Sequence, residues 1–304
     1  MMQTTKTKTP RDMRAHIQDV FGELSGELQK AARYVVDHPA EVAMRSMRSI
    51  SSDANLHPST LVRFARRLGF ESYGEFRSQF RSDVRYQLGS FGEKARSLQA
   101  RAKPSQGMQL MDELLETELS NLRATAAVNS ISDLDSCAEI LAAAERIFVI
   151  GRRSFFPAAY LFHFTYSMFA DNAYLGADQS GTSPSALARL TSKDALLAFS
   201  FDPYATEVVN AVHHARERGC PVIAVTDSPL SPIARSATIS LLAKNDSPSF
   251  FQSVMSSLLI VQYLTIALLI RRGTDGSAAL EATETGLRAL KVYWPLPDVG
   301  SGNL

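Results

Sequence analysis

Cysteine is scarce in this sequence, with only Cys137 and Cys220 among 304 residues. Their spacing is not that of metal ligands and does not suggest a disulfide framework, so we interpret them as reduced cytosolic thiols and expect a cytoplasmic protein. The six histidines offer no metal pair either, because the adjacent His213 and His214 would diverge by about 100° on a helix. We therefore expect neither a metal ion nor another cofactor.

Long hydrophobic runs are also missing. The most apolar segment, residues 258–270 (LLIVQYLTIALLI), includes Gln262 and is shorter than the roughly 20 residues of a membrane span, so we predict a buried core helix and no membrane partner. The first residues, MMQTTKTKTP, lack the apolar run of a signal peptide and are expected to form a frayed tail. The chain also lacks a P-loop, a Gly-rich dinucleotide fingerprint, an internal repeat and a low-complexity segment.

Net charge is nearly absent as well, but the charges are unevenly distributed. The 32 Lys and Arg residues against 31 Asp and Glu residues give +1 overall. Residues 1–103 hold 18 basic and 11 acidic side chains, a net of +7, whereas residues 104–304 hold 14 and 20, a net of −6. A basic region beside an acidic one is typical of a nucleic-acid-binding domain joined to a domain that does not bind DNA. The length also favours two domains.

A helix-turn-helix pattern occupies residues 46–70. From Pro58 to Leu68 the apolar residues fall at i, i+3, i+4 and i+7, which predicts a helix with one buried stripe: Leu61, Phe64, Ala65 and Leu68. Pro58 suits the first helical turn, and Gly69 suits the left-handed position past its end. Met47, Ile50 and Ala54 predict a shorter helix upstream, and Asn55, Leu56 and His57 predict the turn between them.

The opposite face of this second helix is polar and cationic. An arginine-faced second helix after a three-residue turn has the geometry that enters a DNA major groove. The predicted DNA-binding residues are Arg48, His57, Ser59, Thr60, Arg63, Arg66 and Arg67. The flanking arginines are candidates for contacts to phosphates, which position a protein on DNA without specifying sequence: Arg45, Arg48, Arg77, Arg81 and Arg85. The alternative is a small helical bundle whose arginine-rich face is merely solvated.

The helical pattern extends on both sides of this motif. Residues 13–24 and 25–38 resemble two helices, with Ser25 as a cap and a break at His38-Pro39. A further helix is predicted from Ser72 to about Leu88. Residues 89–107 are the predicted linker, with a helical linker as the alternative. We therefore expect a DNA-binding domain over residues 1–88 and a second domain over residues 108–304.

In the second domain the period of the apolar residues changes. Two helical patterns cover residues 108–144 and divide near residues 129–132. Five short apolar runs follow, at residues 146–151, 172–177, 194–200, 221–227 and 238–244. The gaps between the first four can hold crossover helices, such as 154–169 and 206–218, and helices are predicted at 250–272 and 278–291. The predicted fold class is therefore an all-helical domain followed by a three-layer α/β/α domain with a five-stranded parallel sheet.

In such a sheet, ligands bind outside the carboxyl ends of the strands, near helix N-termini. Those ends read Gly151-Arg152-Arg153-Ser154 after the first strand and Ser200-Phe201-Asp202-Pro203 after the third. A serine that opens a helix beside two arginines predicts an anion site, although Ser154 could simply cap its helix. The predicted effector-binding residues are Arg152, Arg153, Ser154, Ser200, Asp202 and Ser249, and further candidates for the pocket are Asp178, Thr182, Ser183 and Ser253.

Taken together, these segments resemble the RpiR family of bacterial transcription regulators, in which a helix-turn-helix domain precedes a sugar isomerase (SIS) domain. The resemblance runs from about Ile17 to Tyr293. In the first domain it is carried by ELQKAARYVVDHPAEVAMRSM and HPSTLVRFARRLGFESYGEF, and in the second by VIGRRSFFPA, LLAFSFDPYATEVV and PVIAVTDSPLSPIA. It implies a regulator of sugar or other small-molecule metabolism, with a small phosphorylated sugar commonly sensed by the SIS domain. By this resemblance, Ser154 and Ser200 occupy the phosphate-holding positions.

The loop after the third strand departs from the pattern of many SIS domains. Their Ser-x-Ser-Gly-x-Thr is replaced here by Ser200-Phe201-Asp202-Pro203-Tyr204-Ala205. Two hydroxyl donors and one backbone N–H are lost and a carboxylate is added, so phosphate binding in the usual pose should be much weaker. Either neighbouring arginine, Arg152 or Arg153, could pair with Asp202. The expected effector is a sugar phosphate or another polar metabolite, such as one bearing an amine or hydroxyls.

The competing functions are an isomerase and a DNA-binding protein whose SIS domain only oligomerises, because the fold alone does not decide between them. Isomerase chemistry needs a positioned acid and base, usually Glu and His. Glu281 and Glu284 have no histidine near them in sequence, and His163 is better read as a helix residue, so we do not expect an enzyme. We predict a homodimer or homotetramer that binds a double-stranded DNA operator with half-sites about 34 Å apart, or a multiple of that, and whose affinity changes when a small-molecule effector binds.

Overall fold

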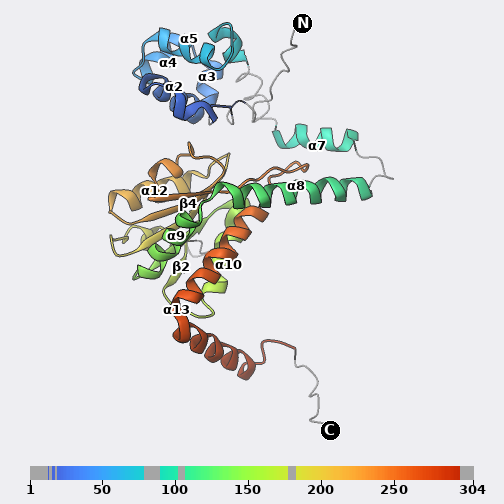
Figure 1. Ribbon diagram of the computed structural model, residues 1–304, viewed down its shortest axis with the longest axis vertical. Helices are drawn as coiled ribbons and strands as arrows, with labels where there is room; N and C mark the ends of the chain where they lie inside the picture. Colours follow the sequence, from blue (N-terminus) through green and yellow to red (C-terminus); the bar gives the residue numbers. More distant parts are fainter. Residues whose placement is uncertain are drawn as a thin grey trace. The chain divides into compact units, whose positions relative to one another are not determined.

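The computed structural model describes residues 13, 16–17, 19–78, 90–101, 107–176 and 183–294 (Figure 1). The chain divides into two compact units. The first comprises Met1–Asn121, Ser228–Arg235 and Asn245–Ser253, and the second comprises Leu122–Asp227, Ser236–Lys244 and Val254–Leu304.

The first unit contains a small bundle of short helices. Its elements are η1 (Phe21–Glu23), α2 (Gly26–Asp37), α3 (Pro39–Met44), α4 (Met47–Asp53) and α5 (Pro58–Arg67), with residues 73–78 also helical. Their apolar faces form one core, in which Ile17, Val35, Ile50, Leu61 and Phe64 are fully buried. The rings of Phe64 and Phe76 meet edge to face with centroids 5.7 Å apart, so the helix from residue 73 packs directly on α5.

Most of the predicted helices of this unit are present, with three differences. Ser25 precedes α2 as predicted, but its side chain makes no capping hydrogen bond. Pro39 ends α2, as expected, and then starts the additional helix α3, whose six residues are too few to show a clear period. The predicted helix over residues 13–24 ends in the 3-10 turn η1. Of the predicted helix 72–88, the part beyond residue 78 lies outside the described residues.

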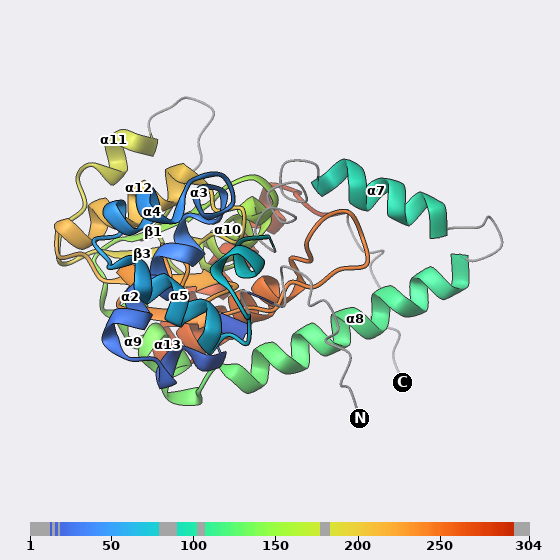
Figure 2. The ribbon, with the colours of Figure 1, turned by 90° about the horizontal axis from the view of Figure 1, so that it is seen from above.

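Two helices follow that have few buried residues. The predicted linker contains α7 (Ser90–Arg101), and α8 (Gly107–Val128) is a continuous rod of 22 residues (Figure 2). Near the C-terminal end of α8, the Asn129 side chain donates to the Leu242 carbonyl and accepts from the Leu242 N–H, both at 2.8 Å. The predicted break near residues 129–132 is confirmed, because α9 begins at Ile131 with Ser130 as its cap.

The second unit is built on a five-stranded sheet. The strands are β1 (Ile147–Gly151), β2 (Ala173–Leu175), β3 (Ala195–Phe199), β4 (Val222–Thr226) and β5 (Ile239–Leu242). They are all parallel, in the order β2-β1-β3-β4-β5. All five predicted apolar runs are therefore strands of one sheet, and the predicted three-layer fold is confirmed.

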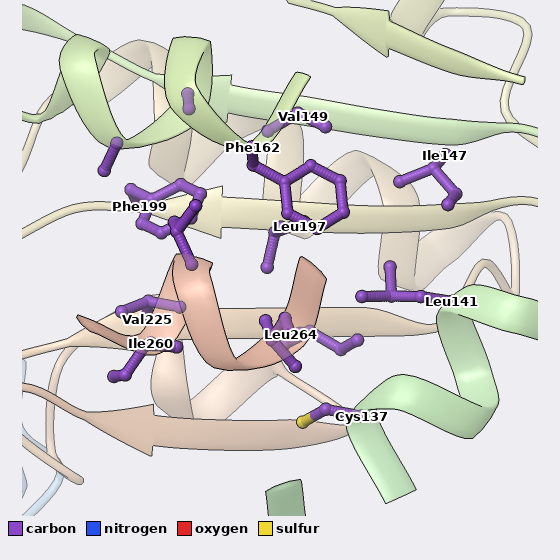
Figure 3. Close-up of a cluster of buried hydrophobic side chains, with 14 of the residues drawn as sticks. Cys137, Leu141, Ile147, Val149, Phe162, Leu197, Phe199, Val225, Ile260 and Leu264 are labelled. Atoms are coloured by element: carbon purple, nitrogen blue, oxygen red, sulfur yellow. The ribbon is translucent and has the colours of Figure 1, made fainter. Parts of the chain in front are cut away.

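Helices cover both faces of this sheet. Alternate strand residues, such as Val149 and Leu197, face α9 (Ile131–Ala143), α10 (Phe156–Tyr166) and α13 (Met255–Ala289) in one buried cluster (Figure 3). The helix α12 (Thr206–Glu217) contacts β3 and β4 and buries Val208, Val212 and Ala215. The short helix α11 (Ser183–Leu187) was not expected from the pattern.

The two helices predicted at residues 250–272 and 278–291 form one element, α13, with a kink at Gly273 (φ 54°). By length and composition α13 could cross a membrane, which is weak evidence taken alone. Its residues Ile260, Leu264 and Leu268 are buried in the core beneath the sheet, as predicted for a core helix. α13 lies beside α10, and the hydroxyls of Thr165 and Thr265 are 3.3 Å apart between them.

Candidate nucleic-acid interface and effector site

The first candidate site is the exposed face of α5. The turn before it has the predicted conformation, because Asn55 adopts a left-handed φ of 50° and Leu56 is buried. His57 is the cap residue, and its Nδ1 accepts from the Ser59 backbone N–H at 3.3 Å. Gly69 ends the helix with a φ of 89°, the left-handed conformation that favours glycine.

The predicted buried stripe of α5 is confirmed, because Leu61, Phe64, Ala65 and Leu68 all lie in the core. On the other side, Ser59, Arg63, Arg66 and Arg67 are exposed, as are His57 and Arg48 on the neighbouring segments. α5 is thus held by its apolar side and presents hydroxyl and guanidinium groups to solvent.

For Thr60 the prediction was wrong. Thr60 was assigned to the outer face, but only 2% of its surface is exposed. Thr60 lies one turn before Phe64 and therefore falls at the edge of the buried stripe. Its hydroxyl accepts from Arg63 Nη2 at 3.4 Å, so Thr60 supports an arginine of the outer face from below.

Two of the arginines are engaged within the protein. Arg67 Nη2 lies 2.8 Å from Glu23 Oε2. Arg45, predicted as a phosphate contact, instead joins α3 to α4 by ion pairs with Glu41 and Asp53. By contrast, no carboxylate of the described chain pairs with Arg48, Arg63 or Arg66.

The carboxylate of Glu41 is held charged. Hydrogen bonds from the Tyr34 hydroxyl (2.9 Å) and from Arg45 (2.7 Å) lower its pKa. Conversely, burial and the hydrogen bond to Glu41 raise the pKa of Tyr34 to about 12. Arg77, another predicted phosphate contact, donates to the Ala43 carbonyl at 3.3 Å. Arg81 and Arg85 lie outside the described residues.

The second candidate site lies at the carboxyl ends of β1 and β3. These strands are neighbours in the sheet, with β2 on one side of β1 and β3 on the other, so the direction of winding reverses between β1 and β3. Ligands bind at this point in open parallel sheets. Gly151 ends β1 where the chain approaches itself closely, since a Cβ atom there would lie 2.5 Å from the Phe155 carbonyl oxygen. Arg153 follows in a left-handed conformation (φ 55°).

The polar groups at these strand ends bind mainly to each other. Ser200 is buried, and its hydroxyl accepts from the Ala205 N–H at 3.1 Å, which holds the loop after β3. Arg152 forms an ion pair with Glu207 at the start of α12, and the suggested pairing of Arg152 or Arg153 with Asp202 stays a prediction. The Asp202 N–H donates to Asp227 Oδ2 at 3.4 Å.

Sequence reasoning missed Asp227 and Glu207. Asp227 directly follows β4, so the rule that indicated Asp202 could also have indicated it. Glu207 lies 55 positions from Arg152, and no local pattern connects the two. The site therefore holds three carboxylates, Asp202, Asp227 and Glu207, together with Arg152.

Two aromatic rings fill the space beneath the two loops. Phe155 and Phe201 stack face to face with centroids 3.8 Å apart, and both are almost completely buried. Ser154, predicted to open a helix, lies instead within the 3-10 turn η2 and is not its cap.

Other predicted site residues lie elsewhere. Ser249 belongs to the first unit, where its hydroxyl accepts from the Phe251 N–H at 3.3 Å. In the same unit, the Ser253 hydroxyl donates to Glu118 at 2.7 Å. Asp178 and Thr182 lie outside the described residues, as does the side chain of Ser183 at the start of α11.

The described residues contain no group of three or more His, Cys, Asp or Glu side chains that could hold a metal ion. His163 is on α10, whereas Glu281 and Glu284 are beyond the kink of α13. Burial raises the pKa of both Cys137 and Cys220 to about 12, so neither thiol is a ready nucleophile at neutral pH.

Comparison with known proteins identifies both regions. Residues 12–86 match the model of the helix-turn-helix domain of the rpiR family, and residues 140–270 match the SIS domain. An uncharacterized HTH-type transcriptional regulator of Caldanaerobacter subterraneus subsp. tengcongensis is 23% identical over 288 residues, which cover 92% of this chain and 99% of the relative.

Two solved structures share the fold. The sugar isomerase domain of an RpiR transcription factor from Sphaerobacter thermophilus has a TM-score of 0.56 and 23% identity, over 58% of this chain and 99% of that one. The NanR protein of Vibrio vulnificus, solved in complex with ManNAc-6P, has a TM-score of 0.55 and 19% identity, over 91% of this chain and 98% of that one. The chain belongs to the RpiR family of transcriptional regulators, with an N-terminal helix-turn-helix domain and a C-terminal SIS domain.

Proposed function

We propose that this regulator binds its operator by inserting α5 into the major groove, and that a metabolite at the strand ends of the SIS domain changes the operator affinity. The observation that carries the proposal is the two-sided character of α5. Leu61, Phe64 and Ala65 fix it to the core, while Arg63 and Arg66 are exposed and unpaired with any described carboxylate. Exposed guanidinium groups on such a helix can reach both base edges and phosphates.

For the effector we propose a polar metabolite that is not held mainly through a phosphate. The Ser200 hydroxyl accepts from the Ala205 N–H, and Arg152 is paired with Glu207. A phosphate would have to displace Glu207 from Arg152, and it would also meet the carboxylates of Asp202 and Asp227. An amine or hydroxyl group could instead donate to these carboxylates. NanR of Vibrio vulnificus, in complex with ManNAc-6P, supports a metabolite as ligand, and the loop chemistry here favours a different anchoring group.

A second candidate function is a DNA-binding protein whose SIS domain only brings copies together. The stacked pair Phe155 and Phe201 favours it, because these rings fill the space beneath the two loops. The two candidates differ in whether any small molecule changes operator affinity.

We further propose that the regulator acts as a homo-oligomer, either a dimer or a tetramer, in the cytoplasm. On α10 the rings of Phe156, Tyr160 and Phe164 form an exposed row, with centroids about 6 Å apart along the row. Beside it, α13 exposes Ile266 and Ile270. This apolar face suits a second copy of the chain, as two-fold binding to a palindromic operator requires.

We also propose that the SIS domain is not an isomerase. Isomerisation requires an acid and a base that both reach the substrate. The groups described at the strand ends are carboxylates, arginines and serines, with no histidine among them, and His163 lies in the last turn of α10, the helix that begins after β1.

The test is to isolate the DNA that the full-length protein retains from sheared genomic DNA. We expect a small set of fragments that share an inverted repeat and that are lost when Arg63 is replaced by alanine. Arg123→Ala is the matched control, since Arg123 is an exposed helical arginine on α8, far along the chain from α5. Retention that is indifferent to sequence, or equal loss with both variants, contradicts the proposal.

The effector is tested by calorimetric titration with sugar phosphates and with unphosphorylated amino and polyhydroxy compounds. We expect the amino or polyhydroxy class to bind, and Asp202→Asn to weaken that binding more than Glu217→Gln, a charge-matched change at the other end of α12. Tight binding that requires the phosphate contradicts this effector class. If no compound changes operator affinity while Phe164→Glu abolishes both self-association and operator binding, the second candidate function is supported instead.

A further inference from the structure

The turn before α5 contains a hydrogen-bond arrangement that determines how Ser59 can interact with DNA. His57 Nδ1 accepts from the Ser59 backbone N–H at 3.3 Å and lies 2.8 Å from the Ser59 Oγ. We infer that His57 makes Ser59 an acceptor-only reader, so that its hydroxyl pairs with an exocyclic amino group of a base rather than with a ring nitrogen or carbonyl. This inference rests on the proposed recognition role of α5.

The direction of the hydroxyl follows from the backbone. A backbone N–H can only donate, so the imidazole nitrogen that receives it carries no proton. With Nδ1 deprotonated, the short contact of 2.8 Å can only be a hydrogen bond donated by the Ser59 hydroxyl. The neutral ring then carries its proton on Nε2. This assignment rests on the 3.3 Å main-chain contact being a hydrogen bond, which requires Nδ1 to be the acceptor.

The consequence concerns the groups that Ser59 can recognise. A free serine hydroxyl can donate or accept and therefore reads bases ambiguously. Here its proton is engaged by Nδ1, so the exposed side of the oxygen offers only lone pairs. In the major groove the matching donors are the N6 amino group of adenine and the N4 amino group of cytosine. Guanine and thymine present only acceptors there and would face the oxygen without a hydrogen bond.

Every base pair has one such amino group in the major groove. A Ser59 oxygen that can only accept therefore specifies which strand of the pair carries the amino group. His57 is thus a positioning residue for specificity, acting through Ser59, in addition to its role as helix cap. Asparagine at this position would preserve the arrangement, since its side-chain oxygen is also an acceptor and Asn is a favoured cap. Alanine would remove the acceptor and allow the hydroxyl to rotate.

The inference is tested with the operator found by genomic retention, in which single bases are replaced by analogues. At each position, one analogue removes the amino donor (purine for adenine, or 2-pyrimidinone for cytosine) and another removes the purine acceptor N7 (a 7-deazapurine). Affinities of full-length wild type, Ser59→Ala, His57→Ala and His57→Asn are measured at pH 8, and a double-mutant cycle isolates the coupling between Ser59 and each base group.

We expect one position where loss of the amino group weakens wild-type binding by about two- to twelvefold, as for one hydrogen bond, and leaves Ser59→Ala unaffected. His57→Asn should keep this coupling, and His57→Ala should lose most of it while remaining helical by circular dichroism. Coupling of Ser59 to N7 instead, coupling to no base group, or full amino coupling in His57→Ala overturns the inference. Failure of wild type to prefer any operator would contradict the proposed function itself, which is a distinct outcome.

Discussion

Glu23 limits the cationic surface of α5, and its removal should strengthen the dependence of DNA binding on salt. Glu23 Oε2 lies 2.8 Å from Arg67 Nη2, and both side chains are largely exposed, at 68% and 48%. An exposed ion pair of this kind contributes at most about 1 kcal/mol to stability, so Glu23→Gln should fold normally. The variant would free the Arg67 guanidinium and remove a carboxylate that repels the DNA backbone.

The magnitude follows from counterion release. Each additional phosphate neutralised by a protein makes the slope of log Kobs against log salt steeper by about 0.9. If Glu23→Gln releases one arginine, raising the salt concentration from 50 to 200 mM should lower the DNA affinity of the variant about 3.5-fold more than it lowers that of wild type. At low salt, Glu23→Gln should bind DNA of any sequence more tightly than wild type does.

The assay is fluorescence anisotropy of a labelled duplex over a series of salt concentrations. Glu27→Gln is the matched control, because Glu27 is an exposed carboxylate of α2 that pairs with Lys30 and carries the same charge. If the two variants give the same slope, the effect is one of overall charge. Arg67 would then not reach a phosphate when Glu23 is removed, and the placement of α5 against the DNA backbone would be wrong.

Four further predictions concern buried residues of the scaffold. The Asp194 side chain is fully buried and accepts hydrogen bonds from Arg146 and Thr191. Asp194→Ala should therefore lower the free energy of unfolding by about 3–5 kcal/mol in urea titrations, and an unchanged free energy of unfolding would contradict this expectation. Burial raises the pKa of Asp194, but hydrogen bonds from Arg146 and Thr191 outweigh this effect and hold the pKa below its ordinary 3.8. The charged Asp194 therefore stabilises the fold at neutral pH. Acid titrations should show that this contribution to the free energy of unfolding is lost as the pH falls through the lowered pKa. Gly151→Ala should lower the free energy of unfolding by about 1–3 kcal/mol by calorimetry, because the alanine methyl group would meet the Phe155 carbonyl. An unchanged melting temperature would show that the turn relaxes freely. Thr60→Val should reduce operator affinity much less than Arg63→Ala does in gel shifts, since Thr60 is buried and only supports Arg63, and a loss as large as that of Arg63→Ala would return Thr60 to the DNA-reading face.

The elements that the sequence predicted best are those whose apolar residues repeat locally. The stripe of Leu61, Phe64 and Ala65 and the five buried strand runs are properties of neighbouring residues, and each appears in the structure at nearly the expected place. Asn55 and Gly69 were also predictable, because a left-handed backbone strongly restricts the choice of residue.

The errors concern features that distant residues decide. Thr60 lies at the edge of the stripe, and the packing around α5, which periodicity does not specify, determines whether that edge is covered. The partner of Arg152 could not be predicted, since Glu207 and Asp202 both follow β3 and only the folded loops place Glu207 against the guanidinium. The short helix α3 contains too few residues to show a period. The predicted domain boundaries at residues 88 and 108 stay predictions.

The most direct test of the claim that α5 reads DNA is the specificity ratio of Arg63→Ala. Affinities of wild type, Arg63→Ala and Arg123→Ala are measured for the operator and for a scrambled duplex of the same length. If Arg63 contacts a base edge, its loss should cost about 1–3 kcal/mol on the operator, or about 5- to 150-fold, with little change on the scrambled duplex. Full operator affinity in Arg63→Ala, or an equal loss on both duplexes, would contradict the assignment of α5 as the recognition helix.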